Sequence, residues 1–543
     1  MNNKFKIGLL ISNNDLSCSN YNLIDSLSKN KDIEIIVLYS KLSKNKEKFF
    51  RKYILKLTRK KINALFFHCI ITIEKYIFKL IYKNTENTYD LKTLNLKTIF
   101  INPVFSKSGL FISYDEKNIK ILKNLSLNLI IRVNTPGIYK GDILNVSKIG
   151  ILSFHHGDNN WNRGGPAAFW EVYKKKDATG FIIQLLTSEL DAGKVICRGE
   201  YMTKEFYYTN KQKLLNDSYY HMEKVINNII AGNKIKIEDQ YPFDGEILKI
   251  PNFKITFHYF VLFILKLCNK AFRKLFPKQR IWSIYFSRTS FKNLKFKKAI
   301  KIKNPTGKWF ADPFVYKFKE SSFIYFEEFN VKDNIGSISC IELLNDNSYK
   351  YLGQVVKEKF HLSYPFLFDF KGVIYMVPES SKDNSIRLYK CVSFPLKWTY
   401  QYNLMDNINA ADTNIFFHDN KYWLTTNVDP TNKGDQNSIL NCYYSDSPIS
   451  KEWIEHNNNP IQFRNGARNA GYVNNKNIKI SQKFSFNEYG KSLEISEIEE
   501  LNINSYKEKK LHEIHPKFFK NAIGIHHLSS NDEYTVFDVK SYK

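Results

Sequence analysis

The sequence lacks the features that mark several common protein classes. It has only seven cysteines, scattered from Cys18 to Cys442 without a Cys-x-x-Cys pair. Such an odd, dispersed set argues against a disulfide framework or a zinc cluster, and it favours a reducing compartment. No G-x-G-x-x-G motif follows the first strand-like run, so nicotinamide binding is unsupported. That run, Ile7–Ile11, is too short for a signal peptide, and we expect a cytoplasmic protein.

Acidic residues are also scarce. There are 53 Asp and Glu against 81 Lys and Arg, a formal net charge of +28 in 543 residues. A positive field of this size attracts phosphates and anionic lipids, although a genome biased towards lysine, asparagine and isoleucine would produce the same balance. At about 150 residues per domain, the length predicts two or more domains.

The segment 150–195 carries the clearest chemical pattern. The apolar run Ile149–Phe154 predicts a buried strand with His155 just past its end. Gly164, Gly165 and Pro166 are expected to open a helix that runs to about Lys175, because proline is tolerated in a first helical turn. Phe181–Leu186 predicts a second strand, and Asp191 follows in a Leu-Asp-Ala-Gly turn. We expect His155 and Asp191 to face one crevice at strand ends.

This pattern resembles the N-terminal domain of folate-dependent formyltransferases, which include methionyl-tRNA formyltransferase and the sugar N-formyltransferases. The family's Asn-x-His falls on Ser153 and His155, its Arg-Gly on Arg163-Gly164, and its Leu-Asp-x-Gly turn on Asp191. The family's Ser-Leu-Leu-Pro loop is replaced by residues 157–160. The resemblance covers residues 1–245. It implies a Rossmann-like α/β domain and 10-formyltetrahydrofolate as the formyl donor.

The same resemblance implies catalytic roles for His155, Asp191 and Ser153 and substrate binding by Arg163 and Gly164. Formyl transfer to an amine passes through an oxyanion that needs positioned donors, and the family uses its asparagine and histidine for this. Ser153 has one donor on a shorter stem, so it compensates only partly. In a purely structural alternative, His155 hydrogen-bonds Asp158 or Asn159.

Two basic, apolar stretches accompany this domain. Residues 41–83 alternate basic and apolar side chains with a helical period, which predicts an amphipathic helix pair. Residues 246–290 predict a basic amphipathic linker helix whose apolar core, Ile255–Cys268, is too short to span a bilayer that needs about 20 residues. Each stretch is interpreted either as a contact with the anionic inner-membrane surface or as an ordinary packed helix.

Beyond residue 290 the sequence changes to short aromatic strands separated by turns. A strand–turn–strand unit recurs about every 50 residues, beginning near Asp312, Tyr364, Asp412, Ala470 and Gly524. A repeat of this period with all-β texture is typical of propeller blades, so residues 291–543 are predicted to form a five-bladed propeller.

The repeat region also resembles a known family. Ala311–Phe314, Phe326–Glu328, His361–Pro365 and Met376–Ser380 look like the N-terminal domain of plant glucosamine inositolphosphorylceramide transferases. That domain is similar to five-bladed propellers of sugar-cleaving enzymes, in which acidic residues meet near the central axis. The resemblance covers about residues 282–543. It predicts substrate binding by Asp312, Glu328, Glu379 and Asp412, with His361, His526 and His527 at the rim and no metal.

The two halves together predict a transferase of bacterial surface-polysaccharide biosynthesis. In the leading hypothesis it transfers a formyl group to an amino group of a nucleotide- or lipid-linked sugar. In the alternative, paired carboxylates of the propeller perform glycosyl transfer or glycoside hydrolysis, and the first domain is degenerate. A third hypothesis is a non-enzymatic glycan-binding protein. Nucleic acid is not expected as a partner.

Overall fold

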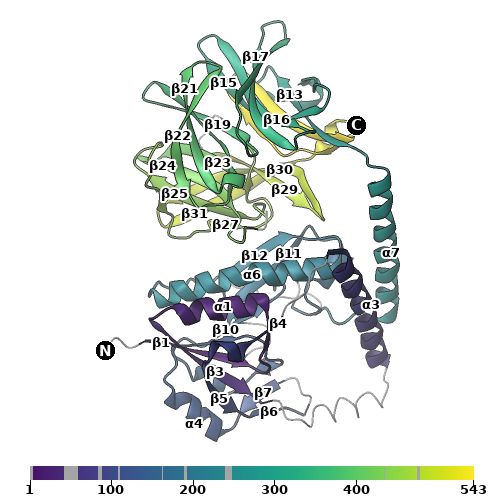
Figure 1. Cartoon of the computed structure of the whole chain (residues 1–543), viewed down its shortest axis with the longest axis vertical. Helices are drawn as coiled ribbons and strands as arrows, with labels where there is room; N and C mark the ends of the chain where they lie inside the picture. The colour runs from purple at the N-terminus through teal and green to yellow at the C-terminus, as the bar shows by residue number, and fades with distance from the viewer. Residues whose placement is uncertain are drawn as a thin grey trace. The chain divides into compact units, whose positions relative to one another are not determined.

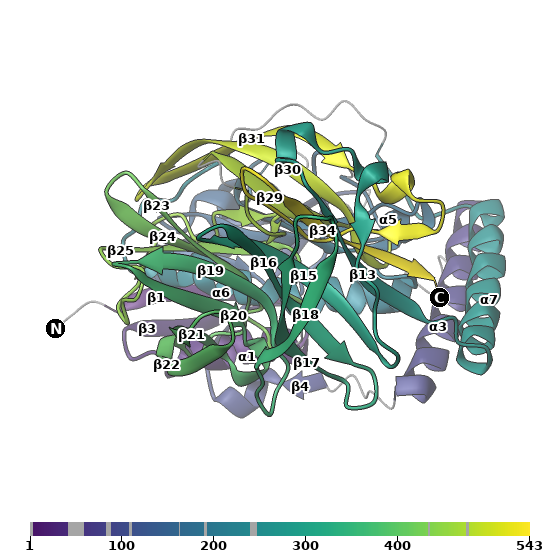
Figure 2. The same cartoon turned by 90° about the horizontal axis from the view of Figure 1, so that it is seen from above.

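The chain folds into two compact units. The computed structural model describes residues 4–41, 59–82, 88–107, 111–161, 163–188, 193–238, 247–432, 435–473 and 477–542. The units are Met1–Asn269 and Lys270–Lys543, and both are drawn in Figures 1 and 2. The boundary between them falls inside the segment 246–290 that the sequence predicts as a linker.

The first unit is an α/β fold built on a seven-stranded sheet. Its strands, in spatial order, are β12 (Lys194–Met202), β11 (Ala178–Leu185), β10 (Ile151–His155), β8 (Leu129–Arg132), β1 (Phe5–Ile11), β3 (Ile33–Ser40) and β5 (Lys97–Ile101). The strands from β10 to β5 are parallel, whereas β11 and β12 are antiparallel to their neighbours. Because β1 pairs with β3 on one side and β8 on the other, the strand order reverses beside it. Ligands collect at such switch points.

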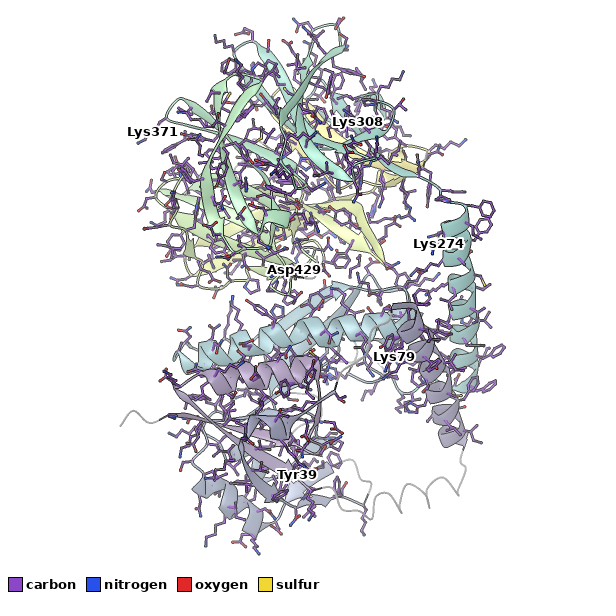
Figure 3. The ribbon with its side chains drawn as sticks, in the orientation of Figure 1. Tyr39, Lys79, Lys274, Lys308, Lys371 and Asp429 are labelled. Carbon is purple, nitrogen blue, oxygen red and sulfur yellow. The ribbon has the colours of Figure 1, made fainter. Side chains whose placement is uncertain are left out.

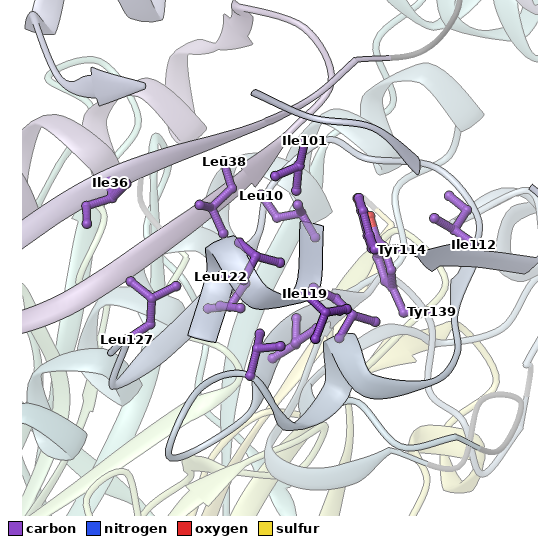
Figure 4. Packing of buried hydrophobic residues seen from close by; sticks show 14 residues of the cluster. Leu10, Ile36, Leu38, Ile101, Ile112, Tyr114, Ile119, Leu122, Leu127 and Tyr139 are labelled. Carbon is purple, nitrogen blue, oxygen red and sulfur yellow. The ribbon is translucent and has the colours of Figure 1, made fainter. Parts of the chain in front are cut away.

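Helices cover both faces of this sheet. α1 (Cys18–Lys29) and α6 (Tyr207–Ile230) lie side by side on one face, and α4 (Glu116–Asn124) packs on the other (Figure 1). Figure 4 shows how Ile119 and Leu122 of α4 join Leu10 and Leu38 in the buried core. The remaining short elements are β2 (Asp15–Ser17), β4 (Thr88–Asp90), β6 (Pro103–Phe105), β7 (Phe111–Tyr114), β9 (Ile138–Tyr139) and two 3₁₀ turns at Leu91–Leu94 and Asp142–Asn145.

The helix predicted from Gly164 to Lys175 is much shorter in the structure. Only α5 (Phe169–Tyr173) is helical, and the residues from Gly164 to Ala168 form bends and turns. Ala168 has φ of +65°, in the left-handed region, so the helix cannot extend backwards through it. The prediction that Pro166 occupies a first helical turn was wrong for this reason.

Two longer helices lie beside one another at one edge of this unit. α3 (Arg59–Tyr82) occupies the second part of the predicted helical insertion, whose first part, 42–58, lies outside the described residues. α7 (Phe253–Leu275) is the predicted linker helix. Among the described residues, α7 is the one helix long and apolar enough to cross a membrane. The prediction took only the apolar core Ile255–Cys268 as too short, whereas the whole 23-residue helix has the length and hydropathy of a span.

The second unit consists of five antiparallel sheets within its described residues. The first combines β13 (Arg280–Ser287), β14 (Ile300–Lys301), β32 (Ala522–Gly524), β33 (Leu528–Ser530) and β34 (Thr535–Tyr542). The next two are β15 (Lys308–Phe318), β16 (Ser321–Asn330), β17 (Ile335–Leu343), β18 (Tyr349–Val356), and β19 (Ser363–Phe370), β20 (Val373–Glu379), β21 (Ser385–Ser393), β22 (Lys397–Asp406). The last two are β23 (Ala410–His418), β24 (Lys421–Val428), β25 (Ile439–Ser445), β26 (Ile454–Glu455), β27 (Gln462–Phe463), and β28 (Arg468–Asn469), β29 (Ile478–Ser485), β30 (Glu488–Asn502), β31 (Ser505–Ile514).

These sheets follow one another in a closed series. Strand β15 contacts β13 and β34 behind it and β19 ahead of it, β19 contacts β23, and β23 contacts β28. The last sheet returns to the first through β30 and β32. The first sheet itself joins the two ends of the unit, because β13 pairs with β34 from Arg280–Tyr542 to Ser287–Thr535. Each of the five sequence repeats therefore supplies strands to a different sheet.

A buried carboxyl in α5 generates a prediction about pH. Glu171 is 1% exposed, neither of its carboxylate oxygens has a hydrogen-bond partner in another residue, and burial raises its pKa from 4.5 to about 7. Because the folded state holds this proton more tightly than the unfolded state, stability falls as pH rises from about 5 through 7. We expect Glu171→Gln to be neutral at pH 5 and to stabilise the protein by on the order of 2 kcal/mol at pH 8.

Urea denaturation at both pH values measures this difference. Glu320→Gln, in an exposed turn, is the control and should shift neither midpoint. An equal effect of Glu171→Gln at pH 5 and pH 8 would contradict the assignment.

Candidate functional site

In the first unit, His155 lies where the sequence predicts it, at the carboxyl end of β10. Together with Arg132, Tyr139 and Gln184 it lines a cavity of about 70 Å³ at the ends of β8, β10 and β11. Arg132 is oriented by donating from Nε and Nη2 to the carbonyl of Thr135, at 3.1 and 2.8 Å. A histidine and an arginine at a strand-end cavity suit an anionic or polarised ligand.

The other predicted residues of this unit are placed less favourably for formyl transfer. Ser153 is 2% exposed, and its hydroxyl donates to the carbonyl of Phe154 at 3.1 Å. Gly164 lies against the backbone of Leu248, where an added Cβ would be 1.7 Å from the carbonyl oxygen, so this glycine allows a close backbone approach. Asp191 lies outside the described residues. Asp158 forms an ion pair with Arg198. The sequence-based alternative instead pairs Asp158 with His155.

The same backbone irregularity recurs in three strands of the second unit and turns polar side chains inwards. Strands β15, β19 and β23 each carry an irregularity in register, at Ala311/Phe314, Ser363/Phe366 and Ala411/Asn414. At these three places Asp312, Tyr364 and Asp412 have φ of 50°, 47° and 50°. A left-handed residue in a β-bulge redirects its side chain, and non-glycine residues in this region cost on the order of 1 kcal/mol or more.

These bulges contribute to a buried cluster that we call the acidic centre, drawn from all five sheets. It contains five carboxyl groups and three basic side chains: Asp312, Glu327, Glu379, Asp412, Asp538, Arg468, His526 and His527. Arg468 Nε lies 2.6 Å from Asp412 Oδ2, and its Nη2 lies 3.5 Å from Glu379 Oε2. His526 Nδ1 lies 2.6 Å from Asp538 Oδ2, and its Nε2 lies 3.5 Å from Asp312 Oδ1.

The carboxyl groups of the acidic centre differ in proton affinity. Burial and the neighbouring carboxylates raise the pKa of Asp312 to about 8, against the opposing charge of His526. The same causes raise the pKa of Glu327 well above its usual value. Burial raises the pKa of Asp412 to about 6, although Arg468 opposes this. At neutral pH the centre therefore holds protonated carboxyls beside ionised ones, which is the pairing that general acid–base chemistry needs.

Asp538 is held in the ionised form. Burial opposes its charge, but His526 and the surrounding donors keep its pKa below the usual range. The backbone N–H groups of Asp312, His526 and His527 all donate to this carboxylate at 3.1 Å. Asp538 and Asp312 raise the pKa of His526 in turn, against its burial. This ion pair fixes the position of Asp312.

Glu328 does not join the acidic centre. It accepts hydrogen bonds from Lys308, Ser339 and Tyr351, away from the other carboxylates. Neighbouring side chains on a strand point to opposite faces, so Glu327 of β16 faces the centre instead, where its Oε1 lies 3.4 Å from His361 Nε2. The structure thus brings together Asp312, Glu379 and Asp412 as predicted and replaces Glu328 by Glu327.

The centre has polar capacity left for a ligand. Glu327 is 4% exposed and His527 is 0% exposed, and beyond the long contacts of Glu327 Oε1 with His361 and of His527 Nδ1 with Asp312, Glu327 Oε1 and the ring nitrogens of His527 have no hydrogen-bond partner. The histidines predicted at the rim, His526 and His527, are in fact buried inside the centre. Ligand atoms of Asp312, His526 and Asp538 lie within 4.8 Å of one another, so these three residues form the group that could hold a metal ion.

Sequence reasoning missed Arg468 and Asp538. Both had a signal, since Arg468 precedes the fourth repeat by two residues and Asp538 ends the fifth repeat. Arg468 is 12% exposed in its side chain and lies over the ring of Tyr489 at 5.1 Å. It is therefore the buried counter-charge of the centre.

Known proteins resemble the two units separately. Residues 297–529 match the family model of glucosamine inositolphosphorylceramide transferase 1, N-terminal. The protein of that name from Oryza sativa subsp. japonica is 34% identical over 205 residues, which is 36% of this chain and 27% of the relative. The chain thus spans about a quarter of the length of the first curated relatives that it matches. The predicted resemblance of the second half is confirmed over the matched residues.

A methionyl-tRNA formyltransferase from Blochmanniella floridana is 28% identical over 176 residues, 31% of this chain and 53% of the relative. Among solved structures, a family 117 glycoside hydrolase of Zobellia galactanivorans covers 48% of this chain and 90% of its own, with 11% identity and a TM-score of 0.32. A glycinamide ribonucleotide transformylase of Symbiobacterium toebii covers 44% and 96%, with 11% identity and a TM-score of 0.29. The two curated relatives are both named transferases.

The geometry predicts that Arg468 holds the acidic centre together. Replacing it by methionine removes the cation from Asp412, which is 2% exposed, and leaves a buried carboxylate uncompensated. We expect Arg468→Met to destabilise the second unit by about 3–5 kcal/mol at pH 8 and by less at pH 5, where Asp412 becomes protonated. Chemical denaturation measures both values.

The control is Lys421→Met, which breaks the exposed pair with Asp446. Exposed pairs contribute little, so its denaturation midpoint should stay near that of the parent protein. Equal losses from the two substitutions would remove Arg468 from its assigned role.

Proposed function

We propose that the protein is a sugar-directed transferase whose acidic centre binds and activates the sugar. The observation that carries this proposal is the convergence of five carboxyl groups, four of them buried, in which the pKa values of Asp312, Glu327 and Asp412 are raised and that of Asp538 is lowered. The five sheets are then the blades of a five-bladed propeller, with the acidic centre on its axis. The closed series of sheet contacts and the bulged inner strands support this arrangement.

In this proposal the centre performs general acid–base chemistry at an anomeric carbon. Asp312 is protonated at neutral pH because of its raised pKa, and it donates that proton to the departing oxygen as the bond from this oxygen to the anomeric carbon breaks. The acceptor hydroxyl forms the new bond to the anomeric carbon, and its proton passes to Asp412, which is ionised above about pH 6. Asp412 and Glu379, both close to Arg468, accept hydrogen bonds from sugar hydroxyls. Glycosyl transfer between a nucleotide- or lipid-linked sugar and an acceptor uses this combination of acid and acceptor groups. The names of the curated relatives support transfer over hydrolysis.

The neighbouring residues Glu327 and Glu328 provide a matched test. Asp312→Asn should lower kcat by at least about 100-fold, because acid–base groups contribute factors of this size. Glu327→Gln should also lower kcat, because the Glu327 carboxyl group helps to raise the pKa of the acid cluster in which Asp312 lies. Glu328→Gln should change kcat by less than about threefold. The assay follows sugar release and transfer from a panel of nucleotide-linked amino sugars by mass spectrometry, with thermal unfolding of each variant as a check on folding.

The pH profile adds a second readout. Because the acid form of Asp312 is lost as pH rises through about 8, kcat/KM should fall above that pH. The fall should be absent from the residual activity of Asp312→Asn. Sugar binding without turnover in the parent protein would support the non-enzymatic hypothesis instead, and full activity in Glu327→Gln and Asp312→Asn would exclude the acidic centre.

Formyl transfer at His155 is the second candidate. It is favoured by the strand-end cavity that His155 and Arg132 line beside the topological reversal of the sheet. Under this proposal the chain modifies an amino sugar of a bacterial surface polysaccharide with a formyl group from 10-formyltetrahydrofolate. The engaged hydroxyl of Ser153 makes this the weaker proposal, because the oxyanion then loses a donor.

Calorimetric titration with a stable reduced folate tests the second candidate. Binding should occur in the parent protein and weaken by at least about tenfold in His155→Ala if the histidine contacts the cofactor or its formyl group. Glu327→Gln is the control, and it should bind the folate unchanged. Absence of any binding heat in the parent protein, confirmed at two temperatures, would exclude folate-dependent chemistry.

A further inference from the structure

Helix α7 exposes a continuous apolar stripe. Phe253, Phe257, Val261, Ile264 and Leu265 are between 39% and 54% exposed, and their spacing of three or four residues places them on one side of the helix. A helix on the surface of a soluble protein normally turns polar side chains outwards. A contiguous exposed apolar surface marks a place where another apolar phase binds.

The opposite side of α7 is attached to the first unit along its length. Tyr259 Oη donates to Glu74 Oε2 of α3 at 2.6 Å, and the ring of Phe263 packs against the ring of Phe78 in α3. Further along, Lys266 Nζ donates to the carbonyl of Glu205 at 2.7 Å. Since one side is fixed to protein, α7 does not cross a bilayer as a lipid-surrounded helix. The exposed side of α7, which includes the apolar stripe, is available to lipid.

The charges on these helices select an anionic partner. α7 contains no Asp or Glu, and the one acidic residue of α3, Glu74, is 0% exposed. Basic residues cluster towards the end of α7, at Lys270, Arg273 and Lys274. Lys79 of α3 and Lys274 of α7 are labelled in Figure 3, and the two helices lie side by side in Figures 1 and 2. The basic residues follow the stripe along α7 and project from the other side of the helix, as headgroup-contacting residues do when the apolar side enters the acyl chains.

We propose that α7 lies in the plane of an anionic membrane surface, with its apolar stripe among the acyl chains and its basic end at the headgroups. Phe257, Val261 and Leu265 enter the acyl region, and Lys270, Arg273 and Lys274 contact lipid phosphates. Lipid-linked sugars are held at the same kind of surface. The membrane contact is independent of which site is catalytic.

Vesicle sedimentation of the full chain tests this proposal. The parent protein should bind vesicles that contain phosphatidylglycerol, bind neutral phosphatidylcholine vesicles much more weakly, and release from the anionic vesicles as salt is added. The triple variant Phe257→Ser, Val261→Ser, Leu265→Ser should lose at least about tenfold in vesicle affinity. Because these side chains are exposed, the variant should fold normally, as circular dichroism and thermal unfolding verify.

A matched triple variant on the second unit is the control. Phe417, Val392 and Leu511 are 46%, 58% and 46% exposed, and their replacement by serine should leave vesicle binding unchanged. Equal losses in the two triple variants, or equal binding to neutral and anionic vesicles, would overturn the proposal. So would a lipid-free dimer, seen by analytical ultracentrifugation, that the α7 triple variant abolishes, because a second copy would then cover the stripe.

Discussion

The clustering of five carboxyl groups, four of them buried, around too few positive charges is the constraint on which the second unit depends. Arg468 is shared by Asp412 and Glu379, and His526 is shared by Asp538 and Asp312, so two cationic groups serve four of the five carboxyl groups. Such a cluster is stable only if some of its members keep their protons, and this is why Asp312 and Glu327 have raised pKa values. The raised pKa values that stabilise the buried cluster are therefore the same ones that would let it donate protons in a reaction.

The two candidate sites differ in how their residues are held. At the acidic centre several groups have fixed partners, for example Asp538 with three backbone donors and Arg468 with two carboxylates. Around His155 the nearby polar groups serve the fold, since Arg198 engages Asp158 and the Ser153 hydroxyl bonds to its own strand. Preorganised groups contribute more to a transition state than groups that must first reorient. This difference is the physical reason for proposing the second unit, rather than the first, as the place of the chemistry.

The sequence predicts the framework better than the orientation of individual side chains. The strands of the first unit are detectable because they are apolar runs buried on both faces, and the five repeats each mark a sheet of the second unit. Whether Glu327 or Glu328 faces the acidic centre depends on the register of β16 against β15, which contains a bulge. Composition does not reveal this register. The helix predicted from Gly164 is wrong because the left-handed Ala168 has no sequence signal, and the predicted linker helix 246–290 is longer than the helix Phe253–Leu275 that forms within it.

The bulged position has a further consequence for how chemistry is distributed over the second unit. Asp312, Tyr364, Asp412 and the glycine at 471 all adopt positive φ at comparable places in four successive sheets. The backbone conformation is thus maintained with a carboxylate, a phenol or no side chain at all. Four of the five sheets therefore carry one position at which the side chain can change while the sheet stays the same. In the proposed propeller, ligand specificity would depend on a few separate side chains rather than on a continuous surface.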